Sequence, residues 1–504
     1  MNKTAIKNFA VWAKKKLISE ITYKAGLLGI TEKGVADALP QSTKDLQFFN
    51  IGTKDYTQIS KNEINQRNAL VSHINEKAKS SDYKTAFQSV VEEVAYTWFN
   101  RLVAVRFMEV NDYLPSRIRV LSSESPAKSE PDFVTNPFDT DLEFSAYERD
   151  RVMQLKDENK LDELFRMLFI KQCNKLNEIL PELFEKTDDY TELLLNISFT
   201  DKEGVPYHLA HDINEIDFRE AVEIIGWMYQ YYNEDRKNEV INIYKGIVKK
   251  EDIPAATQLF TTDWVVRYMV NNSLGKYWVE RNPNSKLRDK LTYFIGDNTI
   301  AVDEKISPED LKILDPCMGS GHILVYAFDV LIMIYEESGY SKIDAVRLIL
   351  QKNIYGLDID DRAYQLAYFA VMMRARSYSR RILVENISPN LCAIQESGDL
   401  KSFDQGIGQR RLDEQYKETA NYLIQVFKNA KEYGSLIEIE NRDYEDLFNY
   451  IEKLKKEGTD NLDIYSWYSN ISKVMPNLIK QATVLSQLYD VVVTNPPYLN
   501  KMDH

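Results

Sequence analysis

The sequence has no segment that would carry it across a membrane or anchor it in one. Its first residues, MNKTAIKNFAVWAKKK, contain no apolar core followed by a small-residue cleavage site. No uninterrupted apolar run approaches the roughly 18 residues that cross a bilayer. We therefore expect a cytoplasmic protein without a membrane partner. With 504 residues and 44% hydrophobic content, the chain is long enough for two or three globular domains.

Cysteine and histidine are scarce. The three cysteines, Cys173, Cys317 and Cys392, are far apart in the sequence, and the five histidines show no metal-ligand spacing. This distribution supports neither a disulfide framework nor a zinc site, and it is typical of a reducing compartment. We expect a function that requires no metal ion.

Positive charge is in deficit, since 63 Lys and Arg against 77 Asp and Glu give a formal net charge of −14. A protein that coats nucleic acid non-specifically needs clustered cations to neutralise phosphates, so this class is disfavoured. A DNA enzyme with a local basic groove is compatible with the sequence. Short basic runs occur at 14–16 and within 374–381, although most such runs are solvated helix faces.

Residues 1–250 show the pattern of a mainly helical N-terminal domain. Apolar residues recur at helical spacing after Thr4, a candidate N-cap, and along EVAYTWFNRLVAVRFME, where Trp98, Leu102 and Val105 share one face. Another helix is expected to begin near Asp217, where Glu220 three residues later resembles a capping box, and to run through IIGWMYQYY. The stretch 115–144 is rich in Ser, Pro, Asp and Asn, which predicts a long loop or a break between helical subdomains.

The pattern changes at about residue 251. Short β-like runs (ILDP, NIYGLDID) alternate with helical ones (HILVYAFDVLIMIY, AYQLAYFAVMMRAR) up to residue 404. This alternation predicts an α/β fold with a Rossmann-like parallel sheet. Residues 405–485 return to a charged helical pattern and form a predicted helical insertion. In residues 486–504 an apolar strand, YDVVVT, runs into a rigid turn.

The string ILDPCMGSGHILVYAF, residues 313–328, has the features of a ligand-binding turn. A predicted strand ends at Asp315 and Pro316, and Gly319, Gly321 and a predicted helix follow. Glycines let the backbone approach a ligand closely, and a helix N-terminus supplies unpaired N–H groups. Two glycines at this spacing are weak evidence alone, whereas the full string is far more specific.

The string NIYGLDIDDRAYQLA, residues 353–367, places Asp358 at the end of the next predicted strand. An acidic residue in that position can accept hydrogen bonds from ribose hydroxyls. Asp358 follows Gly321 by 37 positions (358 minus 321), against about 20 in dinucleotide dehydrogenases, which disfavours an NAD enzyme. A surface acidic turn is the alternative interpretation.

The third string is Asn495-Pro496-Pro497-Tyr498, directly after the predicted strand 490–494. Such a turn could hold the amino group of a substrate base, for example the N6 group of adenine. This group is a poor nucleophile because its lone pair is delocalised into the ring, so an enzyme must hold it with acceptors. The Asn side-chain oxygen and a backbone carbonyl beside a proline can do so. The prolines stiffen the turn, and the Tyr ring can stack on a base that has left the double helix.

In their order and in their residues, these strings resemble a class of amino-methyltransferases in which a threonine segment, the glycine loop, the acidic strand end and NPPY follow one another. DPCMGSGHIL is similar to the cofactor loop of DNA adenine methyltransferases almost letter for letter. More narrowly, MNKTAIKNFAVWAKKKLISEITYKAGLLGI, AYTWFNRLVAVRFMEVNDYLPSRIRVLSS and QLFTTDWVVRYMVNNSLGKYW look like the PglX family of BREX (bacteriophage exclusion) systems. The resemblance covers essentially the whole chain.

The resemblance implies a site-specific DNA adenine-N6 methyltransferase that uses S-adenosyl-L-methionine and marks host DNA in phage defence. The implied partners are double-stranded DNA with a flipped adenine and other BREX proteins. The implied cofactor-binding residues are Thr261, Asp315, Pro316, Gly319, Gly321, Asp358 and Asp399, and the implied catalytic residues are Asn495, Pro496, Pro497 and Tyr498.

Each implied residue has a role in the family. Thr261 would contact the methionine carboxylate, although this chain has Thr-Thr where the family usually has Thr-Pro. Asp315 would bind the cofactor amino group, Asp358 the ribose and Asp399 the cofactor adenine. The two glycines would approach the cofactor by backbone, and NPPY would hold and stack the target adenine. His322 is part of the family string and is expected to be structural.

In this class the sheet has seven strands, NPPY follows the fourth, and the target-recognition domain comes last. The resemblance therefore implies that this chain corresponds to the N-terminal part of a longer protein with a partial sheet. A sheet that ended at the fourth strand would expose an apolar edge. Whether the chain is active by itself is open.

Other interpretations stay open. NPPY also occurs in methyltransferases that act on glutamine side chains of release factors or on rRNA guanine, but those proteins are compact and lack a long helical leader. The chain could also be a non-catalytic binding or scaffold module for defence proteins. A fused nuclease is disfavoured, because Pro131-Asp132 is followed by Leu142-Glu143-Phe144 without the E-x-K of a metal-dependent nuclease.

Overall fold

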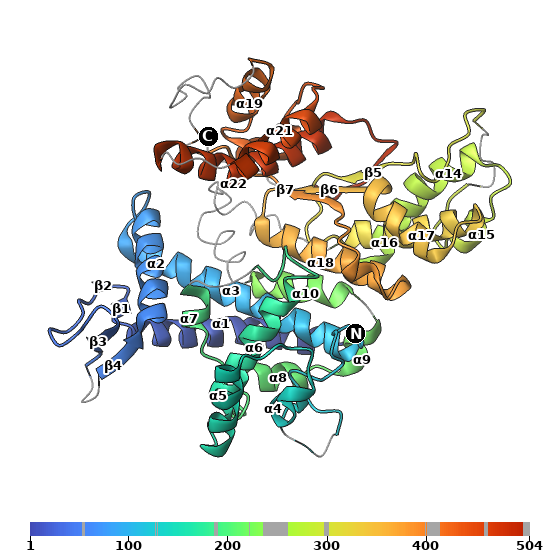
Figure 1. Ribbon diagram of the computed structural model, residues 1–504. Helices are drawn as coiled ribbons and strands as arrows, with labels where there is room; N and C mark the ends of the chain where they lie inside the picture. Colours follow the sequence, from blue (N-terminus) through green and yellow to red (C-terminus); the bar gives the residue numbers. More distant parts are fainter. Residues whose placement is uncertain are drawn as a thin grey trace, which may run out of the picture. The chain divides into compact units, whose positions relative to one another are not determined.

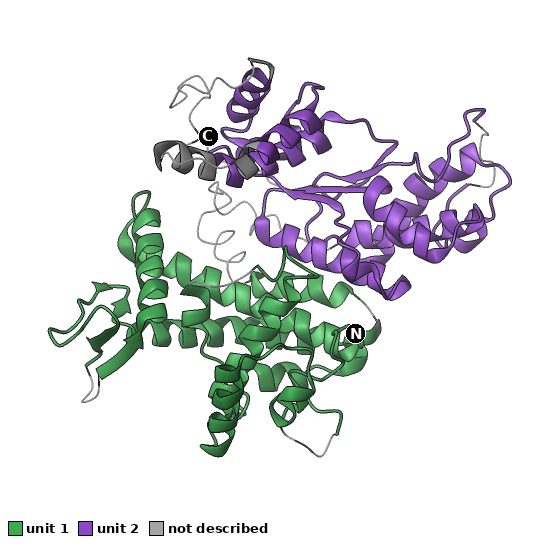
Figure 2. Cartoon of the chain, viewed as in Figure 1, with its two compact units in different colours: residues 1–235 green, residues 236–504 purple. Residues whose placement is uncertain are grey.

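The structure is a computed structural model, and it describes residues 1–52, 56–125, 128, 130–185, 190–220, 222–234, 261–296, 302–398, 400, 414–457 and 462–496. The chain divides into two compact units, Met1–Asp235 and Arg236–His504 (Figure 2). The predicted boundaries near residues 250 and 404 lie outside the described residues. Among the described helices, none combines the length and the apolar character that a membrane crossing requires.

The first unit is mainly helical, as the apolar spacing predicts. Its helices are α1 (Lys3–Leu27), α2 (Lys61–Lys77), α3 (Tyr83–Val110), α4 (Asp132–Thr135), α5 (Ala146–Asp157), α6 (Leu161–Leu176), α7 (Tyr190–Leu194), α8 (Val205–His211), α9 (Glu215–Glu220), α10 (Glu223–Tyr232) and the 3-10 turn η1 (Pro137–Asp139). It also contains two antiparallel hairpins, β1 (Ile30–Thr31) with β2 (Gly34–Val35), and β3 (Leu46–Asn50) with β4 (Tyr56–Ser60).

Helix α3 forms the core of this unit and packs against α1 and α2. Its predicted apolar face is fully buried at Trp98, Leu102 and Val105. The stretch 115–144 is not loop throughout, since it contains α4 and η1. Helix α3 holds its first part in place, because the buried Glu109 carboxylate accepts hydrogen bonds from the N–H groups of Val120 and Leu121, at 2.7 and 2.8 Å. A buried charge is tolerated when it is satisfied in this way.

One predicted helix start and the predicted extent of another helix are wrong. The N-cap of α1 is Asn2, whose side chain accepts from the N–H of Ala5, and Thr4 lies inside the helix. The helix expected near Asp217 begins at Glu215 and ends at Glu220, so that IIGWMYQYY lies in the separate helix α10. Asp217 is not a cap; it is a buried acceptor for the backbone N–H of Asn2, at 3.0 Å.

The second unit contains a four-stranded parallel sheet in the order β7-β6-β5-β8 (Figure 1). The strands are β5 (Ile313–Asp315), β6 (Ile354–Asp358), β7 (Asn390–Ala393) and β8 (Val491–Val492). Ile313 pairs with Ile354 on one side and with Val491 on the other, so β5 is central. The predicted α/β class with a parallel sheet is confirmed. All four strands end at the same edge, called the carboxyl edge below.

The described residues of the second unit also form helices. They are α13 (Asp263–Val270), α14 (Lys276–Arg281), α15 (Leu287–Lys290), α16 (His322–Glu337), α17 (Lys342–Leu348), α18 (Asp361–Tyr378), α19 (Glu414–Val426), α20 (Ala430–Tyr433), α21 (Tyr444–Glu457) and α22 (Leu462–Ser486), with π-helical turns η3 (Asn271–Gly275) and η4 (Ile349–Asn353) and 3-10 turns η5 (Ile382–Val384) and η7 (Gly434–Leu436).

The two faces of β6 contact different helices, because successive side chains of a strand point to opposite sides. Gly356 faces α16, since a Cβ added there would lie 2.8 Å from the Cδ1 atom of Leu324. Tyr355 and Leu357 face the other way, into a cluster with side chains of α19, α21 and α22. In Figure 1, α16 and α18 accordingly lie on one side of β6 and β7, and α21 and α22 on the other.

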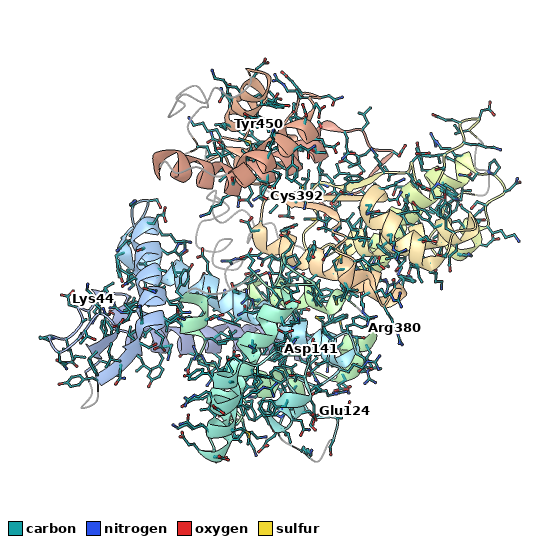
Figure 3. All side chains as sticks on the ribbon, in the orientation of Figure 1. Lys44, Glu124, Asp141, Arg380, Cys392 and Tyr450 are labelled. Atoms are coloured by element: carbon teal, nitrogen blue, oxygen red, sulfur yellow. The ribbon has the colours of Figure 1, made fainter. Side chains whose placement is uncertain are left out.

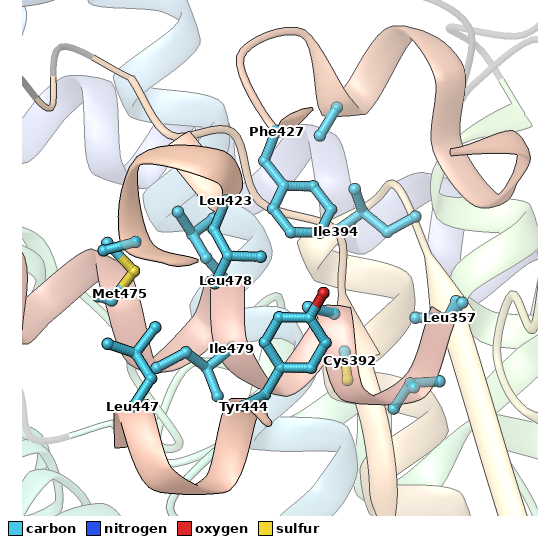
Figure 4. Packing of buried hydrophobic residues seen from close by; sticks show 14 of the residues in the cluster. Leu357, Cys392, Ile394, Leu423, Phe427, Tyr444, Leu447, Met475, Leu478 and Ile479 are labelled. Carbon is cyan, nitrogen blue, oxygen red and sulfur yellow. The ribbon is translucent and has the colours of Figure 1, made fainter. Parts of the chain in front are cut away.

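The helices between β7 and β8 occupy the stretch where the sequence predicts a helical insertion. Figure 4 shows how Leu423, Leu447 and Leu478 from three of these helices pack over Leu357 and Cys392 of the sheet. Cys392 on β7 and Tyr450 on α21 are labelled in Figure 3. These helices therefore form one layer of the domain core.

Candidate functional site

The turn between β5 and α16 brings backbone to the carboxyl edge. The N–H of Met318 donates to the carbonyl of Leu357 at the end of β6, at 2.9 Å, which ties the turn to the sheet. Gly319 and Gly321 have φ values of 52° and 79°, in the left-handed region that favours glycine. Gly321 is also the N-cap of α16. The predicted glycine loop is thus the connection between strand and helix.

The two glycines are needed for different reasons. A Cβ at Gly321 would lie 2.9 Å from the Cα atom of Ala367 on α18, so Gly321 permits close packing of the turn against that helix. A Cβ at Gly319 would have no described atom within 4 Å. Among the described residues nothing packs over Gly319, so a ligand can approach this part of the turn.

Asp315 ends β5 with a fully buried carboxyl group. Its Oδ1 atom accepts from the N–H of Cys317 at 3.2 Å, whereas Oδ2 is buried without a hydrogen-bond partner among the described residues. Burial raises its pKa to about 7, against the smaller lowering effects of the neighbouring Thr494 hydroxyl and the Cys317 N–H. The Thr494 hydroxyl is close enough to lower this pKa, but its Oγ1 atom forms no hydrogen bond with the described residues, so Oδ2 stays unsatisfied.

An unsatisfied buried carboxylate oxygen requires an explanation, because such atoms are rare in folded proteins. A ligand that donates hydrogen bonds or carries positive charge would provide one. An ammonium group in contact with Asp315 would supply both.

Asp358 ends β6 and shapes the glycine loop. Its Oδ2 atom accepts from the N–H of Gly319 at 2.8 Å, and its Oδ1 atom from the N–H of Asp360 at 2.9 Å. The residue is half-buried, but its carboxyl group is surrounded by protein, and this burial raises its pKa to about 7. A carboxylate accepts about four hydrogen bonds, so Asp358 can also receive ligand hydroxyls.

The strand expected over 490–494 is shorter in the structure, where β8 ends at Val492, and Asn495 follows three residues later and contacts the threonine segment. Its Nδ2 atom donates to the Oγ1 atom of Thr261 at 3.0 Å, across 234 positions of sequence. The carbonyl oxygen of Thr261 lies 3.0 Å from Nδ1 of His322, the first residue of α16. Because a carbonyl only accepts, Nδ1 is the donor in this contact. His322 is buried and fixes the backbone of Thr261 beside the glycine loop.

The structure thus brings six of the predicted residues to one edge, and their roles stay predictions. They are Thr261, Asp315, Gly319, Gly321, Asp358 and Asn495. Pro316 is half-buried in the turn, and Pro496 is exposed. Asp399, Pro497 and Tyr498 lie outside the described residues.

Two further features of the edge were not predicted. The first is Thr494, whose hydroxyl lowers the pKa of Asp315. The sequence marks this position only as a polar residue between the apolar run 491–493 and NPPY. The second feature is the segment 431–435 of the helical insertion. Lys431 makes an ion pair with Asp361 at 2.7 Å, and the Ser435 hydroxyl lies 3.9 Å from the Cys317 thiol. No local pattern indicates that this segment returns to the glycine loop.

Comparison with known proteins gives a consistent picture. Residues 352–504 match the family model of the Eco57I restriction-modification methylase. The chain is 39% identical to the adenine-specific methyltransferase PglX of Lacticaseibacillus casei (strain Zhang) over 526 residues, which cover 99% of the chain and 43% of that relative. It is 37% identical to the adenine-specific methyltransferase BrxX of Escherichia coli O9:H4 (strain HS), with 99% and 42% covered.

A more distant similarity, 28% identity over 130 residues, links 21% of the chain to 11% of a putative type II restriction enzyme and methyltransferase from Methanocaldococcus jannaschii. The resemblance to PglX that the motifs predict is confirmed, and it extends over nearly the whole chain. The chain spans less than half the length of the PglX and BrxX relatives.

Proposed function

We propose that this chain carries the cofactor-binding and catalytic residues of a site-specific DNA adenine-N6 methyltransferase that uses S-adenosyl-L-methionine. The observation that carries the proposal is the hydrogen bond between Asn495 and Thr261. It lies at the carboxyl edge, which also holds Asp315, Gly319 and Asp358. The similarity to two adenine-specific methyltransferases and to the Eco57I methylase model supports it.

The residues at this edge fit the proposed cofactor. The unsatisfied Oδ2 atom of Asp315 suits the amino group of a methionine moiety, the open space at Gly319 leaves room for it, and Asp358 suits the ribose hydroxyls. The Thr261 hydroxyl would donate a hydrogen bond to the carboxylate of the methionine moiety. When bound, S-adenosyl-L-methionine supplies an electrophilic methyl group on a sulfonium centre.

Asn495 would hold the target base. Its amide nitrogen is engaged with Thr261, so its Oδ1 atom is the amide atom that would accept a hydrogen bond from the adenine N6 amino group. Pro496 follows directly and restricts the backbone, which keeps this acceptor in place. Holding the amino group by acceptors favours a geometry in which its lone pair can attack.

The target atom lies inside the base stack of duplex DNA, so the adenine must flip out before it reaches Asn495. The wider role, marking host DNA in a phage-defence system together with other BREX proteins, rests on the similarity to PglX and BrxX. Such an enzyme would act in the cytoplasm, where the bacterial chromosome lies.

Methylome sequencing of cells that carry the complete protein tests the proposal. Wild type is expected to produce N6-methyladenine at a defined DNA motif, and Asn495→Ala is expected to remove it. Asn284→Ala, the same change at an exposed position, serves as the matched control. Unchanged adenine methylation in Asn495→Ala would remove Asn495 from its role, and transfer of labelled methyl groups to RNA or protein instead of DNA would refute the substrate.

A further inference from the structure

We infer that Thr261 is a positioning residue through which occupancy of the cofactor site sets the orientation of the Asn495 amide. The inference rests on the proposed function and deepens it. It assigns to one hydroxyl group the link between the site for the methyl donor and the site for the target base.

The contacts of Thr261 place it between these two sites. Its carbonyl oxygen accepts from His322 at the start of α16, so its backbone is held beside the glycine loop. Its Oγ1 atom accepts from Nδ2 of Asn495 at 3.0 Å. Asn495 is half-buried and follows a strand of the sheet, and His322 holds the backbone of Thr261, so both partners are anchored.

A hydroxyl group has one proton to donate and lone pairs that accept. While Oγ1 accepts from Asn495, its proton is directed elsewhere, and the cofactor carboxylate that the proposed function assigns to Thr261 is a suitable acceptor. A carboxylate cannot donate in return. The bound carboxylate therefore fixes the Thr261 proton on its own side and leaves a lone pair for Asn495.

The amide of Asn495 has two orientations that differ by a half-turn. With the Thr261 proton held by a carboxylate, only the amide nitrogen can bond to Oγ1, and Oδ1 then points to the adenine amino group. Without the carboxylate, the hydroxyl can turn and donate to Oδ1. The flipped amide then presents a donor to the base, and two donors do not bind each other. Cofactor occupancy thus selects between two states of one group.

The neighbouring Thr262 provides a matched control. It caps α13, but its side chain makes no capping hydrogen bond, and it is exposed. Thr262→Val therefore makes the same chemical change one position away without touching Asn495. Thr261→Val removes the hydroxyl at nearly constant volume, and Thr261→Ser restores it.

The experiment measures binding, not turnover, in the complete protein. Two unmethylated duplexes contain the DNA motif that the protein methylates. One has adenine at the target position, and the other has purine, which lacks the amino group. Their affinities are compared in the presence of S-adenosylhomocysteine and of its decarboxylated analogue, which keeps the amino group. The quantity of interest is the preference for adenine over purine.

For wild type, the adenine preference is expected to be about fivefold larger with S-adenosylhomocysteine than with the decarboxylated analogue. This factor corresponds to the net contribution of one hydrogen bond to the affinity. Thr261→Val should show the same preference with both ligands. Thr261→Ser and Thr262→Val should behave as wild type.

Equal preferences with the two ligands in wild type would overturn the inference, and this result needs no variant to fold. A wild-type difference that persists in Thr261→Val would also overturn it. If adenine methylation is observed in either case, the proposed function stands without the link. A wild-type protein that binds neither ligand and methylates no adenine would refute the proposed function itself.

Discussion

The two glycines of the turn between β5 and α16 give a quantitative test, because alanine should cost more stability at Gly321 and more ligand affinity at Gly319. Gly319 and Gly321 both have left-handed backbone, with φ of 52° and 79°, and alanine in that region costs about 1–2 kcal/mol. At Gly321 the new Cβ would also lie 2.9 Å from the backbone of Ala367, and relieving such overpacking costs about 1–3 kcal/mol more. Gly321→Ala should therefore lower the free energy of unfolding by about 2–5 kcal/mol, and Gly319→Ala by about 1–2 kcal/mol.

Ligand binding should show the reverse order. The Cβ of Gly319→Ala projects into the open space in which we place the cofactor, so the affinity for S-adenosylhomocysteine should fall about tenfold or more. The Cβ of Gly321→Ala points toward α18, so folded Gly321→Ala should bind with a smaller loss. Urea unfolding of the ligand-free protein and titration calorimetry measure the two quantities.

Gly26→Ala is the control, since Gly26 lies inside α1, where an added Cβ meets no described atom within 4 Å. Alanine there should leave binding unchanged and stability unchanged or increased by up to about 1 kcal/mol. Normal binding by Gly319→Ala would refute the placement of the ligand over Gly319. Equal stability losses in the two loop variants would refute the packing explanation for Gly321.

Other consequences follow from the buried groups. Burial raises the pKa of Asp315 to about 7, so the folded, ligand-free protein keeps a proton that the unfolded chain loses at lower pH, and this contribution to stability is lost as the pH rises from about 4 to about 7. Asp315→Asn should remove that part of the pH dependence, raise the free energy of unfolding at pH 8 by up to about 4 kcal/mol and weaken binding of S-adenosylhomocysteine. Urea unfolding at pH 5 and pH 8 checks the effect on stability. If the difference in unfolding free energy between the two pH values were the same as in wild type, the reasoning would be contradicted. Gly356→Ala would place a Cβ 2.5 Å from Sδ of Met318 and should destabilise the protein by about 1–3 kcal/mol without a positive φ being involved; a neutral effect in thermal unfolding would show that the turn can move away. Tyr277→Phe removes the 2.7 Å hydrogen bond to Asp490 at the start of β8 and should cost about 1 kcal/mol of stability, while a loss of several kcal/mol would indicate a larger role for Tyr277.

The parts of the site that the sequence predicts are those with local signals. A strand that ends in Asp315, a glycine turn and an apolar helix follow one another within a few residues, and the same holds for Asp358 and α18. In each case the polar residue stands where a strand ends, so the parallel sheet brings both to one edge. The contact between Thr261 and Asn495 joins segments far apart in the sequence, and only the order of the strands brings them together.

The features that sequence patterns missed depend on tertiary contacts. The strands β3 and β4 have five residues each, within a leader whose apolar spacing is helical, so no periodic signal marks them. Asp217 has the sequence context of a cap but is a buried acceptor for Asn2. Lys431 contacts Asp361 across 70 positions, and nothing local indicates this ion pair.

The central claim is that one edge of the sheet holds a methyl donor beside Asn495. A crystal structure of the complete protein with S-adenosylhomocysteine and a duplex containing its methylation motif tests this most directly. We expect the ligand amino group at Oδ2 of Asp315, the ribose hydroxyls at Asp358 and the N6 atom of a flipped adenine within hydrogen-bond distance of Oδ1 of Asn495. A ligand bound away from Gly319, or an adenine that does not contact Asn495, would contradict the account.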